Sequence, residues 1–180
     1  MEVWRRSDSL EVERKNMSIS KVEIDRLSVT SSKSFEAVLA ALKAAVGHPD
    51  MVEFANAIRN AQTFPELERT VEQSLGNTGL MIFMELDHGE ILRKATGLDK
   101  PKIVRLVIGN PLIMQEMAKQ VPDAGSYAPV TILVDERPDG VHLTYDKMAS
   151  LLAAYRNAEA LAVARDLDSK IETILRSSAL

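Results

Sequence analysis

Residues 130–145 hold the feature that restricts the fold most, two short alternating apolar runs joined by a tight turn. The first run is Val130, Ile132 and Val134, and the second is Val141, Leu143 and Tyr145. Alternation with a period of two is typical of strands that bury one face. The two runs share a face only if Arg137-Pro138-Asp139-Gly140 forms a four-residue loop that pairs Glu136 with Val141 and Val134 with Leu143. The sequence therefore predicts a β-hairpin of defined register, with Asp135 opposite His142 on its outer face.

Three more segments are predicted to be strands. The alternation in residues 21–30 slips by one between Ile24 and Leu27, which indicates a β-bulge. Residues 80–86 are almost continuously apolar, as is typical of a central strand that is covered on both faces. Residues 102–108 form the next strand, which ends at Gly109. Together with the hairpin, these segments give a sheet of about five strands.

Apolar residues at helical spacing predict the helices of the first half of the chain. One helix runs from its N-cap Ser34 to Gly47. A pair of helices then occupies residues 49–76, where Thr63 and Glu66 have the spacing of a capping box. Because this pair interrupts the alternation of strands and helices, it is interpreted as an insertion that covers apolar surface.

The second half of the chain predicts further helices and completes the fold class. Asn110 and Pro111 are suited to cap and open one helix. Two helices end the chain, the first capped by Asp146 and the second a long one with an apolar stripe. Adjacent strands with short connections favour an antiparallel sheet over a doubly wound parallel one. We therefore predict an α+β fold, a curved antiparallel sheet with helices packed on it.

Composition restricts the class of protein further. The chain has 180 residues, of which 46% are hydrophobic and 27% charged, and these values are ordinary for a folded domain. Residues 1–20 are predicted to be a polar N-terminal extension without a signal peptide, and residues 21–180 a single domain. No segment approaches the roughly 20 apolar residues of a membrane span, so neither a membrane nor an exported location is expected, and we predict a cytoplasmic protein.

Charge and cysteine content exclude several kinds of site. The net charge is -4 and the basic residues are interspersed with acidic ones, so nucleic acid is not an expected partner. The absence of cysteine excludes disulfides, thiolate nucleophiles and cysteine-ligated metals. His48, His88 and His142 lie on separate elements without ligand spacing, and no nucleotide-binding motif is present, so we predict neither a metal site nor a cofactor.

An ordered series of short motifs carries a resemblance to a known family. The motifs are Leu86-Asp87-His88, Ala95, Gly97-Leu98, Gly109-Asn110-Pro111, Pro129, Gly140-Val141 and Tyr145. Over roughly residues 22–155 the chain resembles the family catalogued as domain of unknown function 302. The resemblance implies a curved sheet similar to one repeat of the TATA-box-binding protein, and a homodimer, but no activity. The helical pair at 49–76, the N-terminal extension and the long last helix depart from the pattern.

Five residues are candidates for a ligand-binding site. Asp87 and His88 follow a strand, where a carboxylate can orient an imidazole, although neighbouring strand residues face opposite ways. Gly109 and Asn110 place the positive end of a helix dipole at a strand end, which suits an anion, although asparagine is also an ordinary N-cap. Tyr145 could donate a phenolic hydrogen bond, or pack in the core as its place in the apolar stripe favours.

Three hypotheses of function follow from these candidates. The first is a ligand-binding or regulatory domain whose small-molecule pocket lies near Asp87, His88, Asn110 and Tyr145. The second is an enzyme for a small polar metabolite, with His88 as acid or base and the Asn110 helix holding an anion, which requires a cleft that reaches both residues. The third is a structural homodimer in which the apolar faces of the 49–76 helices meet.

Overall fold

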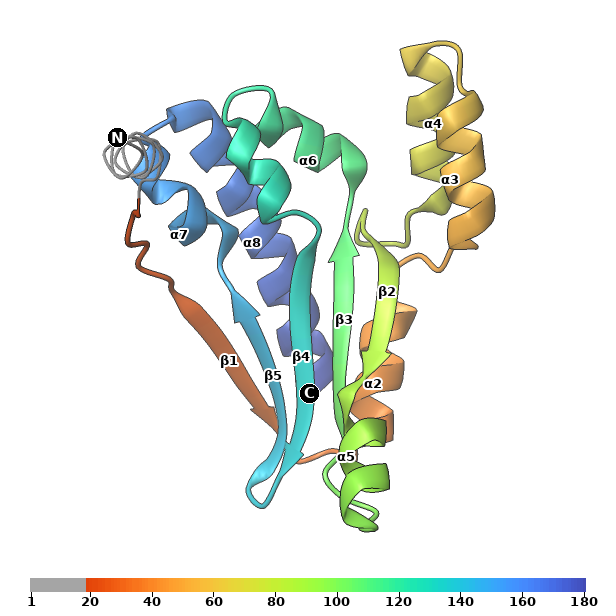
Figure 1. The fold of residues 1–180 in the computed structure, drawn as a ribbon, viewed down its shortest axis with the longest axis vertical. Coiled ribbons are helices and arrows are strands. Elements are labelled where there is room, and N and C mark those ends of the chain that lie inside the picture. The colour runs from red at the N-terminus through yellow and green to blue at the C-terminus, as the bar shows by residue number, and fades with distance from the viewer. Residues whose placement is uncertain (1–18) are drawn as a thin grey trace, which may run out of the picture.

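Five antiparallel strands form one open sheet in the computed structural model, which describes residues 19–180. In spatial order they are β1 (Arg26–Ser31), β5 (Gly140–Asp146), β4 (Val130–Arg137), β3 (Ile103–Gly109) and β2 (Met81–Asp87). The predicted α+β class with an antiparallel sheet is confirmed (Figure 1). Almost all of the predicted extension at 1–20 lies outside the described residues.

The helices pack on one face of this sheet and at its ends. They are α2 (Phe35–Ala44), α3 (Met51–Asn60), α4 (Phe64–Ser74), α5 (His88–Thr96), α6 (Pro111–Ala118), α7 (Met148–Leu152) and α8 (Ala158–Ala179), with short 3-10 turns η1 (Pro122–Ser126) and η2 (Ala153–Tyr155). In Figure 1, α2 and the long α8 lie behind the sheet, while α3 and α4 project beyond one end of it. The predicted long last helix and the helical pair are therefore both present.

The main core fills the space between the sheet and helices α2 and α8. Leu106, Ile132 and Leu143 point from three neighbouring strands toward Leu42 and Ile171, and all five side chains are fully buried. Each such side chain contributes roughly 1.5–3 kcal/mol of transfer free energy. The apolar alternation in β3, β4 and β5 therefore sets which face of the sheet the helices cover.

The hairpin register is as predicted. Glu136 pairs with Val141, Val134 with Leu143, and Asp135 with His142. Arg137 and Gly140 are themselves paired, so the four-residue loop closes as a tight turn over Pro138 and Asp139. Gly140 has a φ of 135°, a conformation that side chains rarely adopt, which explains why glycine stands there.

The prediction that residues 80–86 form a central strand is wrong, because β2 is an edge strand whose strand neighbour is β3. Its apolar residues face different surroundings. Ile82 belongs to the main core, whereas Met81 belongs to a smaller core beneath α3 and α4. Met84 is 53% exposed. An apolar segment whose residues pack in two different cores therefore looks the same in sequence as a strand covered on both faces.

The first strand is shorter than predicted. It begins at Arg26, and the residues from 19 to 25 have no regular secondary structure and lie outside the ladder. The register of β1 against β5 is continuous from Arg26 to Ser31, so the predicted bulge is wrong. The apparent slip after Ile24 arises because that residue precedes the strand and is 49% exposed. The bulge of this sheet lies instead in β2, between Ile82 and Met84.

The chain enters and leaves the helical pair at one point, where two glycines lie backbone against backbone. The amide groups of Gly47 and Gly76 both donate to the carbonyl oxygen of Leu80, at 2.9 Å each. A β-carbon on Gly47 would lie 2.0 Å from the Ser74 carbonyl oxygen, and one on Gly76 would lie 2.4 Å from the carbonyl carbon of Val46. Only residues without a side chain permit this crossing.

Candidate functional site

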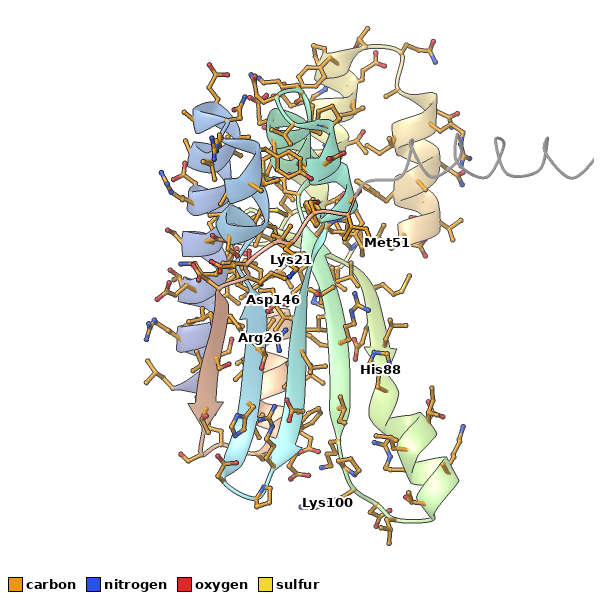
Figure 2. All side chains as sticks on the ribbon, turned by 60° about the vertical axis from the view of Figure 1, so that its left-hand side comes forward. Lys21, Arg26, Met51, His88, Lys100 and Asp146 are labelled. Atoms are coloured by element: carbon orange, nitrogen blue, oxygen red, sulfur yellow. The ribbon has the colours of Figure 1, made fainter. Side chains whose placement is uncertain are left out.

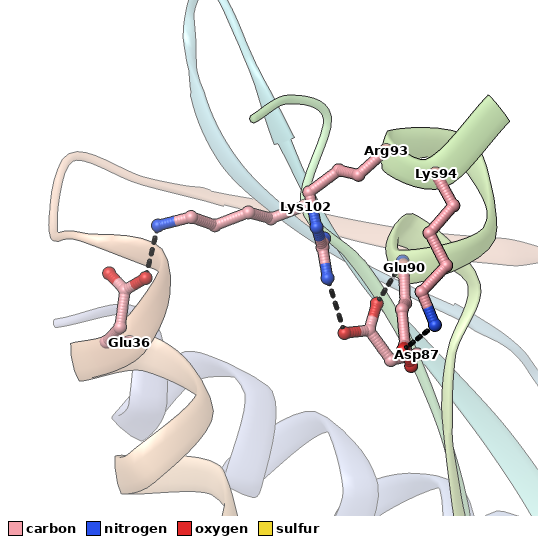
Figure 3. Close-up of polar contacts among 6 residues, drawn as sticks. All are labelled: Glu36, Asp87, Glu90, Arg93, Lys94 and Lys102. Carbon is pink, nitrogen blue, oxygen red and sulfur yellow. Dashed lines mark hydrogen bonds and ion pairs between the residues drawn. The ribbon is translucent and has the colours of Figure 1, made fainter. Parts of the chain in front are cut away.

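Asp87 caps helix α5 and is paired with a cation. One carboxylate oxygen accepts from the Glu90 amide at 2.8 Å, and the other accepts from Arg93 Nη2 at 2.8 Å (Figure 3). The hydrogen bond from Arg93 lowers the pKa of Asp87, while partial burial opposes that shift. The side chain of His88 makes no hydrogen bond or ion pair with the other described residues. The carboxylate therefore does not orient this imidazole.

A cleft of about 610 Å³ lies beside Asp87, between the start of α2 and the adjoining ends of β2 and β3. Lys102 pairs with Glu36 and its ammonium lies 5.9 Å from the centre of the Phe35 ring. Figure 3 shows the neighbouring pairs as well, in which Arg93 bonds Asp87 and Lys94 bonds Glu90. The charges around the cleft largely neutralise one another, which is typical of a solvated surface network.

Gly109 and Asn110 lie at the opposite end of the sheet from Asp87. In the antiparallel ladder Asp87 pairs with Val104, whereas Gly109 pairs with Met81. Val104 and Gly109 are separated by five steps along β3, or roughly 17 Å at the usual rise of a strand. The structure therefore does not bring Asp87 and His88 together with Asn110, and the cavity beside Asn110 does not include His88. Neither this cavity nor the cleft beside Asp87 reaches both His88 and Asn110, as the enzyme hypothesis requires.

The Asn110 side chain makes a hydrogen bond with the fold at each end of its amide. Its oxygen accepts from the Leu112 amide at 2.8 Å, which caps α6, and its nitrogen donates to the Gly79 carbonyl at 3.0 Å. These contacts favour the N-cap interpretation, because both the oxygen and the nitrogen of the side chain already have a partner within the fold. Asn110 also ties the loop before β2 to the end of β3.

Gly109 and Asn110 nevertheless line an apolar cavity of about 110 Å³. Its walls come from the bulge of β2, the end of β3, helix α6, the start of β4 and helix α8. The lining residues are Phe83, Gly109, Asn110, Pro111, Ile113, Met114, Met117, Ala128, Pro129, Val130 and Leu167. A β-carbon on Gly109 would lie 3.1 Å from Cβ of Pro129 and 3.5 Å from the Phe83 ring. The missing side chain therefore helps to keep this space open, and Met114 and Met117 are its adaptable walls.

Tyr145 lies in the core rather than in this cavity. It is 1% exposed, and its hydroxyl donates to Oδ1 of Asp168 at 2.6 Å. Burial, followed by the negative charge of Asp168, raises the pKa of the Tyr145 phenol far above its usual value. The phenol therefore stays protonated at neutral pH, and the core interpretation of Tyr145 is the one that the contacts support.

Asp168 is a buried residue that the sequence interpretation missed. It is 4% exposed and also accepts from the amides of Met148 at 2.8 Å and Ala149 at 3.1 Å. Asp168 thus caps α7 from α8, a role that was predicted for Asp146. Asp146 instead accepts from Nε and Nη2 of Arg26, at 2.6 and 2.8 Å. The sequence contains one indication of this role. Asp168 is a charged residue within the apolar stripe of the last helix.

Two polar side chains on the outer face of the hairpin make their ion pairs within one strand or with the turn. Asp135 and His142 are opposite each other, but each side chain takes another partner. Asp135 is 7% exposed and is paired with Arg137, while His142 Nε2 lies 2.9 Å from the Asp139 carboxylate. The hydrogen bond with His142 lowers the pKa of Asp139. Each of these side chains therefore pairs with a residue two or three positions away and not with the other across the strands.

Residues 19–180 contain no cluster of three or more histidine and acidic side chains arranged to hold a metal ion. Among the helices in this range, none combines the length and the apolar character needed to cross a bilayer.

Comparison with known proteins identifies a family and a fold. The model of the family described as "Domain of unknown function DUF302" matches residues 56–178, from the middle of α3 to the end of α8. A crystal structure of an uncharacterized conserved DUF302 protein from Bacillus stearothermophilus has the same fold, with a TM-score of 0.60 and 14% identity. The similarity covers 85% of this chain and 97% of that one. No curated protein matches this chain.

Proposed function

Because the chain belongs to the family described as "Domain of unknown function DUF302", which names no activity, we propose a function from the geometry of the chain itself. The proposal is a binding domain that takes the apolar part of a small ligand into the cavity between α6, β3, β4 and α8. The observation that carries it is the apolar lining of this cavity, which Gly109 helps to keep open.

The size and lining of the cavity indicate the class of ligand. Apolar cavities of about 150 Å³ in other proteins stay dry and bind benzene, so about 110 Å³ suits a single small ring or a short branched alkyl group. Phe83, Met114, Met117 and Leu167 offer dispersion contacts, and the one polar side chain, Asn110, is engaged elsewhere. Any polar part of the ligand would therefore remain at the cavity mouth.

Filling the cavity is expected to weaken this binding. Replacing Met114 by tryptophan places an indole ring where the ligand would lie, so the affinity for benzene and for n-pentanol should fall at least about tenfold. Amide chemical shifts measured during titration of the full chain would show saturable changes around Gly109 and Ala128 in the natural protein. The same titration of Met114→Trp should need at least about tenfold more of each probe for the same changes.

A matched control separates this effect from a general change in surface. Leu92→Trp adds an indole to α5, at the other end of the sheet, where Leu92 is 39% exposed. This variant should bind both probes as the natural protein does. Shifts that fail to saturate, or that are equal in Met114→Trp, would count against the proposal.

A second candidate is a homodimer formed through the helical pair, favoured by its exposed apolar side chains. Val52 is 71% exposed and Phe64 52% exposed, although Phe54 and Val71 are buried within the pair. Sedimentation velocity is expected to show a dimer that Val52→Asp combined with Phe64→Ser converts to a monomer. Ile24→Ser, which changes an exposed apolar residue elsewhere, should leave the dimer intact. A monomer at every concentration of the natural protein excludes this candidate.

A further inference from the structure

One face of the sheet is free of helices throughout the described residues. Ile132 and Val134 point from β4 into the core beneath α2 and α8, so Leu133 between them points to the other side. We call this side the open face. It carries the residues that alternate in step with Leu133 on β4 and with the residues aligned with Leu133 on β1, β3 and β5. Arg105 pairs with Leu133 from β3, and Thr144 pairs with it from β5. In Figure 1 the open face is turned toward the viewer.

The arginines of the open face differ in their partners. Arg26 donates from Nε and Nη2 to both oxygens of Asp146, and Figure 2 shows these two residues side by side on β1 and β5. Arg137 is paired with both oxygens of Asp135. Arg105 has neither an ion pair nor a side-chain hydrogen bond within residues 19–180. The N–H donors of its guanidinium therefore have no acceptor among the described residues.

A hollow of about 210 Å³ lies between Arg105 and the Arg26–Asp146 pair. Its other lining residues are Thr131, Leu133 and Thr144. Neither threonine hydroxyl makes a hydrogen bond within the described part of the chain. The hollow therefore gathers one guanidinium and two hydroxyls that the fold itself does not use.

The charges around the hollow indicate what it would accept. Arg26 and Arg105 carry two positive charges and Asp146 one negative charge, so the lining has a net charge of about one positive unit. Because Arg26 holds both oxygens of Asp146, that carboxylate is not free to neutralise Arg105. A planar guanidinium matches a carboxylate with two parallel hydrogen bonds.

We propose that this hollow is a carboxylate-binding site, in which the Arg105 guanidinium donates two hydrogen bonds and the hydroxyls of Thr131 and Thr144 complete the contacts. The site is independent of the apolar cavity, which is lined by other residues. A bidentate arginine on an open sheet remains in contact with water, so the dissociation constant is expected to be on the order of millimolar.

The test is a titration of the full chain with sodium acetate at low ionic strength, read by amide chemical shifts. Saturable changes are expected at Thr131 and Thr144, and acetamide, which has no charge, should produce none. Arg105→Met should weaken acetate binding at least about tenfold, and Arg105→Lys should recover only part of it because an ammonium lacks the planar fork.

Arg69→Met is the control. Arg69 is an exposed arginine of α4, so this substitution removes the same charge far from the hollow. It should change the acetate affinity by less than about twofold, because two distant exposed charges interact weakly through water. Equal losses in the Arg69 and Arg105 variants, equal effects of acetate and acetamide, or shifts that never saturate would each overturn the proposal. Unchanged melting temperatures would show that the exposed substitutions leave the fold intact.

A second arm distinguishes a free carboxylate from an acidic side chain of a protein. The probe is the blocked peptide acetyl-Leu-Glu-Leu-amide, with its glutamine analogue as the neutral control. Binding about tenfold tighter than acetate would assign the site to a protein partner whose leucines contact Leu133, and equal or weaker binding would assign it to small carboxylates. Both results support a carboxylate-binding site at Arg105. If neither acetate nor the peptide binds, the proposal is wrong.

Discussion

Replacing Asp168 by alanine is expected to lower the free energy of unfolding by about 3–5 kcal/mol. The substitution leaves the Tyr145 hydroxyl and the amides of Met148 and Ala149 without their shared acceptor. Each buried donor that loses its partner costs roughly 1–3 kcal/mol, which is more than the loss of a typical surface contact. Urea denaturation followed by circular dichroism would measure the change, with the slope of the transition checked for two-state behaviour.

Tyr145→Phe is the matched control for this prediction. It removes a hydroxyl that donates to Asp168 and accepts from the Met148 amide at 3.2 Å, but it leaves the carboxylate with both amide contacts. The expected loss is therefore smaller, about 1–2 kcal/mol. Asp168→Asn keeps the shape but replaces an acceptor by a donor group, and we expect it to resemble the alanine variant. If Asp168→Ala costs less than Tyr145→Phe, the carboxylate does not hold β5, α7 and α8 together.

Replacing Gly76 by alanine is expected to lower the free energy of unfolding by about 3 kcal/mol or more. The new β-carbon would lie 2.4 Å from one backbone atom of Val46 and 2.5 Å from the amide of Gly47, so the two chain segments must move apart. That movement would break the paired hydrogen bonds to Leu80. Thermal and urea unfolding would both show the loss.

Gly125→Ala provides the comparison, because no atom lies within 4 Å of the position of its new β-carbon. Its stability should stay within about 0.5 kcal/mol of the natural protein. Equal stability of the Gly76 and Gly125 variants would mean that the crossing at Gly47 is not a tight one.

Local chemistry made several elements predictable from sequence. The hairpin register depends on the spacing of apolar residues and on a turn of four residues, and both are properties of neighbouring positions. The helix starts at Ser34, Thr63 and Asn110 depend on a side chain that reaches two or three residues along the chain. Interactions of such short range are encoded where they occur.

Long-range partners were not predictable in the same way. The carboxylate that caps α7 comes from Asp168, 20 residues after the amide of Met148 that it accepts from. The apolar run containing Met81 and Ile82 was interpreted as a central strand, because a sequence does not say which neighbour each side chain faces. Only the three-dimensional arrangement separates these cases.

The candidate site was predicted only in part for the same reason. Gly109 and Asn110 do line one cavity, but Asp87 lies at the other end of the antiparallel ladder. Placing all of them in one pocket required knowledge of which strand ends meet. The sequence did not predict a site at Arg105. A single arginine in an apolar strand has the pattern of any exposed cation, and only its neighbours in the fold distinguish it.

The pairing of β1 with β5 has a consequence for synthesis on the ribosome. Strand β1 pairs with β5, and Arg26 lies opposite Asp146. The first strand therefore stays unpaired until Asp146 has left the exit tunnel. Helix α8, which contacts β1, α2, α6 and α7, emerges later still. Contacts of such large sequence separation delay folding. The nascent domain must therefore keep its hydrophobic strands from associating with other chains until α8 has been synthesised.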